Sequence, residues 1–169
     1  MAFYHLLHPR PVVVIGAGKK DEKVNFMACS WITPISEEPE LIGFACYKEN
    51  YTSELIRKYK KFSVNIVEDI DLIWKVGTSS GRKVDKIEKY NIEIGFIEDV
   101  PIIKNSLGYL ICDLFEEYEL GEDYFFVGKV LKWEGKNFER WGWKEHWRVP
   151  LHKGGKAFVF PEKKIRFIR

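Results

Sequence analysis

The sequence predicts a mainly β fold, a mostly antiparallel barrel with a few short helices, and three observations support this prediction. Short runs rich in β-branched and aromatic residues recur along the chain, and turn residues bound each run. Few segments show the helical spacing of apolar residues. The strands and helices also do not alternate regularly, and chains without that alternation favour an antiparallel sheet.

Four predicted strands lie in the first half of the chain. They cover residues 11–18, 24–32, 41–47 and 62–67, which read PVVVIGAG, VNFMACSWI, LIGFACY and FSVNIV. The charged segment KKDEK is typical of a hairpin connection between the first two strands. Pro34 and Pro39 lie between the second and third strands, and we expect them to end the pairing there because proline has no N–H to donate.

The period changes at residues 52–61, which predict an amphipathic helix. We expect Thr52 or Ser53 to be its N-cap, because a hydroxyl oxygen can accept from the free N–H groups of the first turn. Glu54 and Lys58 are four residues apart, which predicts an ion pair on the exposed face of the helix.

Two further short helices are predicted at residues 69–76 and 84–90, and Gly77 is expected to close the first of them. The second half of the chain returns to strands at residues 109–120 and 124–133, joined by a turn that contains glycine. Strands therefore dominate both halves of the chain.

The 169 residues predict a single domain, because a chain of this length with 46% apolar residues can bury one core. Residues 134–169 show no clear period, and we expect them to form a C-terminal extension that packs on the barrel or on a dimer partner. Trp141, Trp143 and Trp147 lie in this extension, and tryptophan is enriched where proteins bind one another.

Composition and charge exclude several functional classes. The 27 basic residues nearly cancel the 25 acidic ones, which argues against a nucleic-acid-binding protein. No apolar run reaches the roughly 18 residues of a membrane span and no targeting leader is apparent, so we expect a cytoplasmic protein without a membrane partner. The chain has no glutamine but abundant lysine, glutamate and isoleucine, a composition typical of thermophile proteins.

The cysteines and histidines predict no metal site. Cys29, Cys46 and Cys112 lie far apart in apolar runs, which indicates buried reduced thiols rather than metal ligands or disulfides. The four histidines form no HExxH motif and no Cys/His ligand set.

No arrangement of catalytic side chains is apparent either. The sequence has no GxSxG motif and no phosphate-binding P-loop, and GAG at residues 16–18 lacks the third glycine of a dinucleotide fingerprint. We therefore identify no catalytic residue, and any difficult chemistry would belong to a bound cofactor.

The stretch NFMACSWITPIS at residues 25–36 is the first candidate for a cofactor site. It offers backbone amides along an extended segment, short polar side chains at Asn25, Ser30 and Thr33, and an apolar wall at Trp31. A flat heteroaromatic ring with a polar rim needs these features. The structural alternative is that Asn25 and Ser30 bond to neighbouring backbone and that Trp31 belongs to the core.

The helix that begins at Thr52 and Ser53 is the second candidate, because the free N–H groups of a helix N-terminus attract phosphate. Lys48 precedes this helix, and the loop SSGRKVDK at residues 79–86 supplies more groups that bind anions. The groups in that loop are Ser80, Arg82 and Lys86. Ordinary helix capping and a solvated charged loop are the respective alternatives.

Several motifs also occur in a characteristic order. They are N-x-M-x-x-S-W-x-T-P-I-S at residues 25–36, a threonine-led helix at Thr52, F-x-V-N-I at 62–66, S-G-R-x-V-D-K at 80–86 and G-x-x-x-x-F-x-G-x-V at 121–130. In this order they resemble the flavin reductase-like, FMN-binding split-barrel family that includes flavoredoxin. The tail segment HKGGKAF is similar to the closing segment of that family.

The resemblance implies a homodimer of Greek-key-like split β-barrels that holds FMN near the subunit interface and accepts a hydride from NADH or NADPH. It implies an FMN-dependent reductase that passes electrons to a small-molecule acceptor or to a redox partner. The cofactor-binding residues that it implies are Asn25, Met27, Ala28, Ser30, Trp31, Cys46, Lys48, Thr52, Ser53, Ser80, Arg82, Lys86 and Phe158. Among them, Thr52 and Ser53 would receive the phosphate, whereas Lys86 and Phe158 would lie beside the flavin.

One position departs from the family. Its hairpins often read G-D-H, whereas this chain has Asp123 at the histidine position and Tyr124 next to it as another possible donor. A carboxylate beside reduced flavin would oppose the anionic form that an imidazole favours. Two alternatives therefore stay open: an FMN-binding electron-transfer module without nicotinamide activity, and a barrel without flavin whose tryptophans bind a protein.

Overall fold

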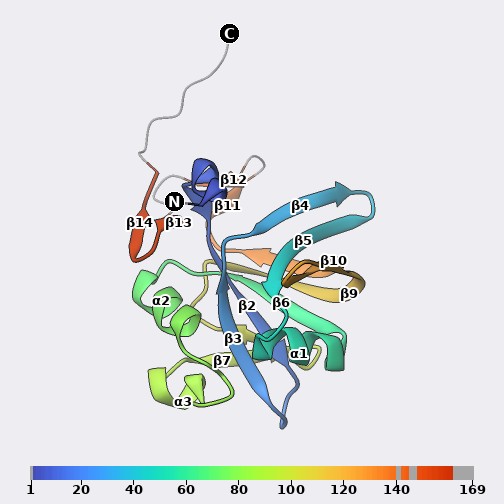
Figure 1. Ribbon diagram of the computed structural model, residues 1–169. Helices are drawn as coiled ribbons and strands as arrows, with labels where there is room; N and C mark the ends of the chain where they lie inside the picture. Colours follow the sequence, from blue (N-terminus) through green and yellow to red (C-terminus); the bar gives the residue numbers. More distant parts are fainter. Residues whose placement is uncertain (1, 140–141, 145–147, 162–169) are drawn as a thin grey trace.

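The computed structural model describes residues 2–139, 142–144 and 148–161, and its architecture is the mainly β fold that the sequence predicts (Figure 1). The strands are β1 Arg10–Pro11, β2 Val13–Gly18, β3 Val24–Cys29, β4 Ile32–Glu37, β5 Glu40–Tyr47, β6 Lys61–Ile66, β7 Ile94–Ile97, β8 Val100–Ile103, β9 Gly108–Leu120, β10 Asp123–Gly135, β11 Phe138–Glu139, β12 Gly142–Trp143, β13 Leu151–Gly154 and β14 Ala157–Val159. The helices are the 3-10 helix η1 Phe3–Leu7, α1 Tyr51–Tyr59, α2 Ile70–Thr78 and α3 Lys86–Tyr90.

A seven-stranded sheet in the order β3-β2-β6-β9-β10-β5-β4 forms the body of the molecule, and each neighbouring pair in it is antiparallel. Helix α1 lies against β2 and β3, whereas α2 and α3 lie on the other side of β3 (Figure 1). The smaller sheets are β1-β13-β14, β7-β8 and β11-β12. The fold class predicted from the sequence is therefore confirmed.

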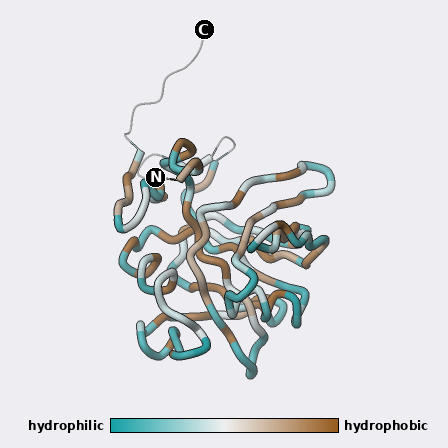
Figure 2. The backbone as a smooth tube through the Cα atoms, in the orientation of Figure 1, coloured by the Kyte–Doolittle hydropathy of each residue, from teal (hydrophilic) through white to brown (hydrophobic). Residues whose placement is uncertain are grey.

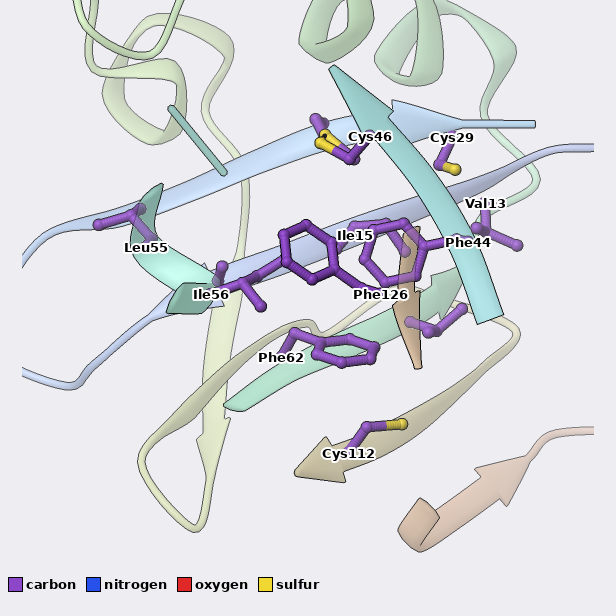
Figure 3. Close-up of a cluster of buried hydrophobic side chains, with 13 residues drawn as sticks. Val13, Ile15, Cys29, Phe44, Cys46, Leu55, Ile56, Phe62, Cys112 and Phe126 are labelled. Carbon is purple, nitrogen blue, oxygen red and sulfur yellow. Dashed lines mark hydrogen bonds between the residues drawn. The ribbon is translucent and has the colours of Figure 1, made fainter. Parts of the chain in front are cut away.

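One cluster of apolar side chains fills the barrel, and we call it the barrel cluster. Its buried members are Val13, Ile15, Ala17, Met27, Cys29, Phe44, Cys46, Leu55, Ile56, Phe62, Val64, Cys112 and Phe126. The rings of Phe44, Phe62 and Phe126 converge at its centre (Figure 3), with centroid distances of 5.2 Å and 5.5 Å from Phe44 to the other two. Burying each ring contributes about 1.5–3 kcal/mol, so these three side chains anchor the barrel.

A second cluster, which we call the helix cluster, lies between the sheet and helices α2 and α3. Its buried members are Val12, Val14, Phe26, Val67, Ile73, Val76, Ile92 and Ile103. Strand β2 serves both clusters, since Val14 belongs to the helix cluster and Ile15 to the barrel cluster. A strand that is buried on both faces needs apolar residues on both, which explains the run VVVIGAG. The turn between β2 and β3 is hydrophilic (Figure 2).

Each of the six predicted strand regions contains a strand, but the expected effect of the prolines is wrong. Pro34 lies inside β4, opposite Ile42 of β5, and the pairing continues to Glu37 and Glu40. Strand β4 is the outermost strand of the sheet, where a residue without an N–H can be tolerated. The ladder shifts register just after Pro34, and Pro39 lies in the turn beyond it.

The α1 helix is confirmed, but two details predicted for it are wrong. Its N-cap is Asn50, not Thr52 or Ser53, which lie inside the first turn. Glu54 does not pair with Lys58, because Glu54 binds Arg82 and Lys58 binds Glu22. None of the described helices is both long and apolar enough to cross a membrane.

Two features in the middle of the chain differ from the prediction. Helix α2 does not close at Gly77 but continues to Thr78. The β7–β8 hairpin was not predicted, because Glu98 and Asp99 form its turn with positive φ angles and Pro101 lies in its second strand. These are unusual residues at those positions, so the usual turn and strand patterns do not reveal the hairpin.

The described part of the C-terminal extension contacts the chain's own barrel. Strand β13 pairs with β1, opposite Arg10 and Pro11, and Phe158 of β14 packs against the helix cluster. Trp143 of β12 contacts Phe138, with ring centroids 5.3 Å apart. Trp141 and Trp147 lie outside the described residues.

Candidate functional site

The free edge of β3 is the starting point of the candidate site. Strand β3 ends the seven-stranded sheet, and among the described strands only β2 pairs with it. Lys86 Nζ donates to the Phe26 carbonyl at 2.7 Å, so the carbonyl of Phe26 points away from β2. Backbone groups alternate along a strand, so the N–H and C=O of Ala28 point the same way. Ala28 therefore offers unpaired backbone groups at this edge.

A cleft of about 230 Å³, which we call the β3-edge cleft, opens beside these groups. It brings together Ala28, Ser30 and Phe158 from the predicted set. Its complete lining is Val12, Ala28, Cys29, Ser30, Ile73, Trp74, Gly77, Thr78, His152, Gly155 and Phe158. Helix α2 approaches β3 closely here, since a Cβ on Gly77 would lie 3.0 Å from the Ala28 Cβ. The result is a narrow space between a strand edge, a helix and an aromatic side chain.

A second cleft of about 440 Å³, which we call the η1 cleft, adjoins the first. Its lining is Tyr4, His5, His8, Arg10, Ser30, Trp31, Ala45, Asp123, His152, Gly154 and Gly155. Ser30, His152 and Gly155 line both clefts. Trp31 is 40% exposed here, which excludes the alternative that its indole belongs to the core.

No side chain of the described residues caps the first turn of α1. The N-cap Asn50 makes no capping bond, because its Nδ2 faces Met27 Sδ at 3.8 Å and Cys46 Sγ at 3.5 Å. In α2 and α3, by contrast, the N-cap residues Asp69 and Asp85 each accept from two N–H groups. The N–H groups of Ser53 and Glu54 donate to the Asn50 carbonyl, but those of Tyr51 and Thr52 have no partner among the described residues. Free N–H groups at the amino end of a helix are favourable for an anion.

Three of the other predicted residues meet beside that end of α1. Asn25 Nδ2 donates to Thr52 Oγ1 at 2.8 Å, in a buried contact between β3 and the helix. The loop after α2 lies directly over Asn25, since a Cβ on Gly81 would come within 2.2 Å of the Asn25 Oδ1. Arg82 is held by an ion pair with Glu54 at 2.6 Å. Asn25 therefore bonds to a side chain of α1 and not to neighbouring backbone.

Cys46, Met27 and Ser53 lie inside the barrel cluster or against it. The Ser53 hydroxyl donates to the Tyr47 carbonyl at 2.9 Å and lies 2.8 Å from Cys46 Sγ. Cys46 Sγ in turn lies 3.4 Å from Met27 Sδ. Burial raises the pKa of the Cys46 thiol, so the group stays protonated at neutral pH. These side chains pack against the first turn of α1 on its buried side.

Lys48, Ser80 and Lys86 lie apart from one another. Lys48 binds Glu119 of β9, and Ser80 is exposed on its loop. Lys86 is buried, and its Nζ donates to the carbonyls of Phe26 and Val76, both at 2.7 Å. Burial lowers the pKa of Lys86 from 10.5 to about 8. The structure therefore does not join Ser80, Arg82 and Lys86 into one exposed cationic group.

Sequence reasoning missed several residues of the two clefts, above all His152, Arg10 and Tyr4. His152 begins the segment HKGGKAF, from which the family resemblance implies a site residue only at Phe158. Tyr4 belongs to η1, which is too short to show a period. No signal in the sequence indicated that η1 would meet Trp31.

Three other cavities among the described residues contain none of the predicted site residues. Two of them are larger, at about 610 Å³ and 640 Å³, and they lie beside α2 with the residues before β7, and between β4, β5 and the β9–β10 hairpin. No group of three or more His, Cys, Asp or Glu side chains within the described residues is arranged to hold a metal ion. The β3-edge and η1 clefts are therefore the candidate site.

The chain is similar to known proteins over most of its length. The family described as "Flavin reductase like domain" matches residues 4–146. An uncharacterized protein of Archaeoglobus fulgidus is 35% identical over 131 residues, covering 74% of this chain and 72% of the relative. The structure of the FMN-binding protein from Thermus thermophilus with bound 1-cyclohex-2-enone aligns with a TM-score of 0.89 at 25% identity, covering 99% of this chain and 94% of that one. Flavoredoxin from Methanosarcina acetivorans aligns with a TM-score of 0.86 at 26% identity, covering 99% and 92%. This chain belongs to the flavin reductase-like family.

Proposed function

We propose that this protein binds FMN and acts as a reductase that takes a hydride from NADH or NADPH and passes electrons to an acceptor. The family, and the FMN-binding protein and flavoredoxin that share the fold, support this proposal. The observation that carries it is the free β3 edge at Ala28, because unpaired backbone groups there face a cleft with aromatic walls.

The β3-edge cleft fits a flat ring with a polar rim. Ala28 offers a backbone N–H and C=O, and Ser30 offers a hydroxyl, as partners for ring nitrogens and oxygens. Trp74 and Phe158 offer apolar surfaces on other sides of the cleft. The isoalloxazine ring would lie here, beside the edge of the sheet.

The amino end of α1 fits the phosphate of FMN. Its free N–H groups and the positive end of the helix dipole favour a dianion. Thr52 would act through its backbone N–H, because its side chain is buried and already hydrogen-bonded. Ser53 would only support the turn, because its N–H donates to the Asn50 carbonyl at 3.0 Å and its hydroxyl to the Tyr47 carbonyl. Arg82 lies next to this end through its ion pair with Glu54.

FMN, when bound, would supply the electron-transfer chemistry. The chain itself would bind and orient the ring at β3, hold the phosphate at α1, and limit water through the aromatic walls of the cleft. Hydride transfer of this kind depends mainly on positioning, so we assign no side chain as an obligatory acid or base.

Two measurements test the proposal. Titration with FMN should quench flavin fluorescence and raise the melting temperature of the protein, because a ligand that binds the folded state stabilises it. Anaerobic mixing of the complex with NADH and with NADPH should then bleach the flavin absorbance with at least one of them. Failure to bind FMN would disprove the whole proposal, whereas binding without bleaching by either nucleotide would disprove the reductase activity.

A comparison of FMN with riboflavin tests the phosphate position. Arg82→Ala should weaken FMN binding more than riboflavin binding, because only FMN carries the dianion. Lys83→Ala is the matched control, since it removes one exposed positive charge from the same loop. Equal losses for FMN and riboflavin in the Arg82 variant would place the phosphate elsewhere.

An electron-transfer module is the second candidate, and Asp123 favours it. The carboxylate of Asp123 lines the η1 cleft next to the β3-edge cleft, where it disfavours negative charge on a reduced ring. In that case FMN binds, neither nicotinamide nucleotide bleaches it, and a protein electron donor does.

We also propose a homodimer. Large apolar side chains are exposed along the β9–β10 hairpin, including Phe115 at 51%, Tyr118 at 50% and Trp133 at 54%. Exposed apolar surface of this kind is typical of protein interfaces. Light scattering coupled to gel filtration measures the mass, and a value of 19.9 kDa, that of one chain, would contradict the proposal.

A further inference from the structure

One of the larger cavities shares no lining residue with either cleft of the candidate site. It has a volume of about 640 Å³ and lies between the β4–β5 hairpin and the β9–β10 hairpin, and we call it the hairpin groove. Its floor is apolar and consists of the half-buried side chains of Leu41, Ile42, Ile66, Leu110 and Val130. Cavities of about 300–1,000 Å³ are typical of small-molecule sites, and an apolar floor favours an organic ligand.

Three aromatic side chains form one wall of the hairpin groove, and we call Trp133, Phe138 and Trp143 the aromatic wall. The Phe138 ring is steeply inclined to both indoles, with interplanar angles of 69° to Trp133 and 83° to Trp143. The Trp143 indole lies on the backbone of Gly108, since a Cβ there would be 3.0 Å from its Cη2. Trp133 is 54% exposed and Phe138 42%, so a ligand can reach both rings. Rings at steep angles contact one compact cation from two sides, as in aromatic cages that bind ammonium groups.

The charged side chains that line the hairpin groove all have the same sign. They are Glu37, Glu40 and Glu134, which we call the carboxylate rim, and the described lining residues include no lysine, arginine or histidine. Within the described part of the chain, none of these carboxylates forms an ion pair. A cavity lined by charges of one sign attracts ligands of the opposite sign.

Two contacts prepare the carboxylate rim for a positive charge. Glu37 and Glu40 lie directly opposite each other at the end of the β4–β5 ladder, where like charges repel and a bound cation relieves the repulsion. On the other side of the groove, the Tyr109 hydroxyl donates to Glu134 Oε2 at 2.7 Å and orients that carboxylate. Burial and the nearby Glu134 raise the pKa of Tyr109 to about 12, so the hydroxyl keeps its proton at neutral pH.

We propose that the hairpin groove binds a small organic cation that carries an ammonium group on an apolar body. The ammonium group contacts the aromatic wall and pairs with the carboxylate rim, while the apolar body covers the floor. The rim repels an organic anion, and a neutral ligand gains neither the ion pairing nor the cation–π attraction. Binding of the cation does not depend on FMN, because the groove and the two clefts of the candidate site have separate linings.

Three ligands of similar size test this assignment: phenethylamine, phenethyl alcohol and phenylacetate, which are positive, neutral and negative at neutral pH. Calorimetry measures their affinities, and the NMR signals of the Trp133 and Trp143 indole N–H groups report where they bind. Wild-type protein should bind the amine about tenfold more tightly than the alcohol, and the acid most weakly. Saturation with FMN should leave the affinity for the amine unchanged.

Matched variants separate the carboxylate rim from the overall charge of the protein. Glu134→Gln should weaken amine binding about fivefold and leave alcohol binding unchanged, because it removes the charge but keeps the size of the side chain. Glu38→Gln removes an exposed carboxylate of the β4–β5 turn that does not line the groove, so it should change neither affinity. Trp133→Leu keeps an apolar side chain but removes a ring, so it should weaken amine binding more than alcohol binding.

The assignment is overturned if wild-type protein binds none of the three ligands, if it binds the alcohol or the acid as tightly as the amine, or if Glu134→Gln and Glu38→Gln weaken amine binding equally. Competition between FMN and the amine would also overturn it, because the amine would then lie in the clefts of the candidate site. A second copy of the chain seated on the groove would exclude the amine. Light scattering on the same samples identifies that outcome, which refutes this inference and leaves the proposed homodimer intact.

Discussion

Lys86→Met tests how the corner between α2 and β3 is held. The Phe26 carbonyl lies on the free edge of β3, and the Val76 carbonyl is among the last four of α2, which have no partner inside the helix. The Lys86 ammonium donates to both of these carbonyls. Methionine keeps a long side chain in this 4% exposed position but leaves the two carbonyls without a donor.

Two opposing effects determine how much Lys86→Met changes the free energy of unfolding. Each buried carbonyl without a partner costs about 1–3 kcal/mol. Burial lowers the pKa of Lys86 from 10.5 to about 8, so the charged form carries a penalty of at most about 3 kcal/mol near neutral pH, which methionine removes. We therefore expect a net loss of about 1–3 kcal/mol in the free energy of unfolding, or about 2–12 °C in Tm.

The pH dependence gives a sharper test, because it has a definite sign. The pKa of Lys86 is lower in the folded state, so between pH 8 and pH 10.5 the unfolded chain binds more protons at this side chain. The contribution of Lys86 to stability therefore rises with pH in that window, and Lys86→Met lacks this rise. The stability gap between the two proteins should widen from pH 8 to pH 10.5.

Denaturant unfolding at several pH values in that range measures the gap, and Lys83→Met, an exposed lysine in the preceding loop, is the control. A gap that stays constant or narrows as pH rises would refute the reasoning. It would mean that the hydrogen bonds from the Lys86 ammonium to the two carbonyls raise its pKa enough to cancel the lowering by burial.

Three further predictions follow from single contacts. Gly81→Ala should weaken FMN binding about tenfold in a fluorescence titration, because the new Cβ would lie 2.2 Å from Asn25 Oδ1 and displace the loop. Thr52→Val should lower the free energy of unfolding by about 1–3 kcal/mol, measured with denaturant, because the buried Asn25 amide loses its acceptor. Burial raises the pKa of Cys29 and Cys112 to about 12, so in mass spectrometry both thiols should stay unmodified by iodoacetamide in native protein near neutral pH and react after unfolding.

Each of these predictions has its own control. Gly95→Ala adds a methyl group that meets only ordinary contacts at 3.5 Å or more, and it should leave FMN affinity unchanged. Thr78→Val removes an exposed hydroxyl bond and should cost much less than Thr52→Val. Equal effects within either pair, or rapid labelling of both native thiols, would contradict the corresponding prediction.

The strands were predictable because their apolar runs are local patterns. The run at β2 reflects burial on two faces, which the sequence records directly. Strand β9 is buried mainly in its first half, so its alternation in the sequence located the strand but not its buried face. Side-chain contacts that were predicted from closeness in the sequence were wrong more often than the predicted strands. Lys48 precedes α1 but binds Glu119, because the long β9–β10 hairpin brings that carboxylate to the end of β5.

The candidate site was predictable only in part. Asn25 and Ala28 were found through the motif around β3, yet alternation places them on opposite faces, Asn25 toward α1 and Ala28 toward α2. The η1 cleft could not be foreseen, because Tyr4, Trp31 and His152 come from distant parts of the chain. Tertiary packing alone brings them together.

Strands β2 and β3 contribute side chains to both apolar clusters, and this has a consequence for cooperativity. Neither half of the interior can loosen without exposing residues of a strand that the other half needs. The packing around Phe62 in the barrel cluster and around Ile73 in the helix cluster should therefore be lost at the same melting temperature. Amide hydrogens of the strands beneath α1 and beneath α2 should likewise exchange through one global opening event.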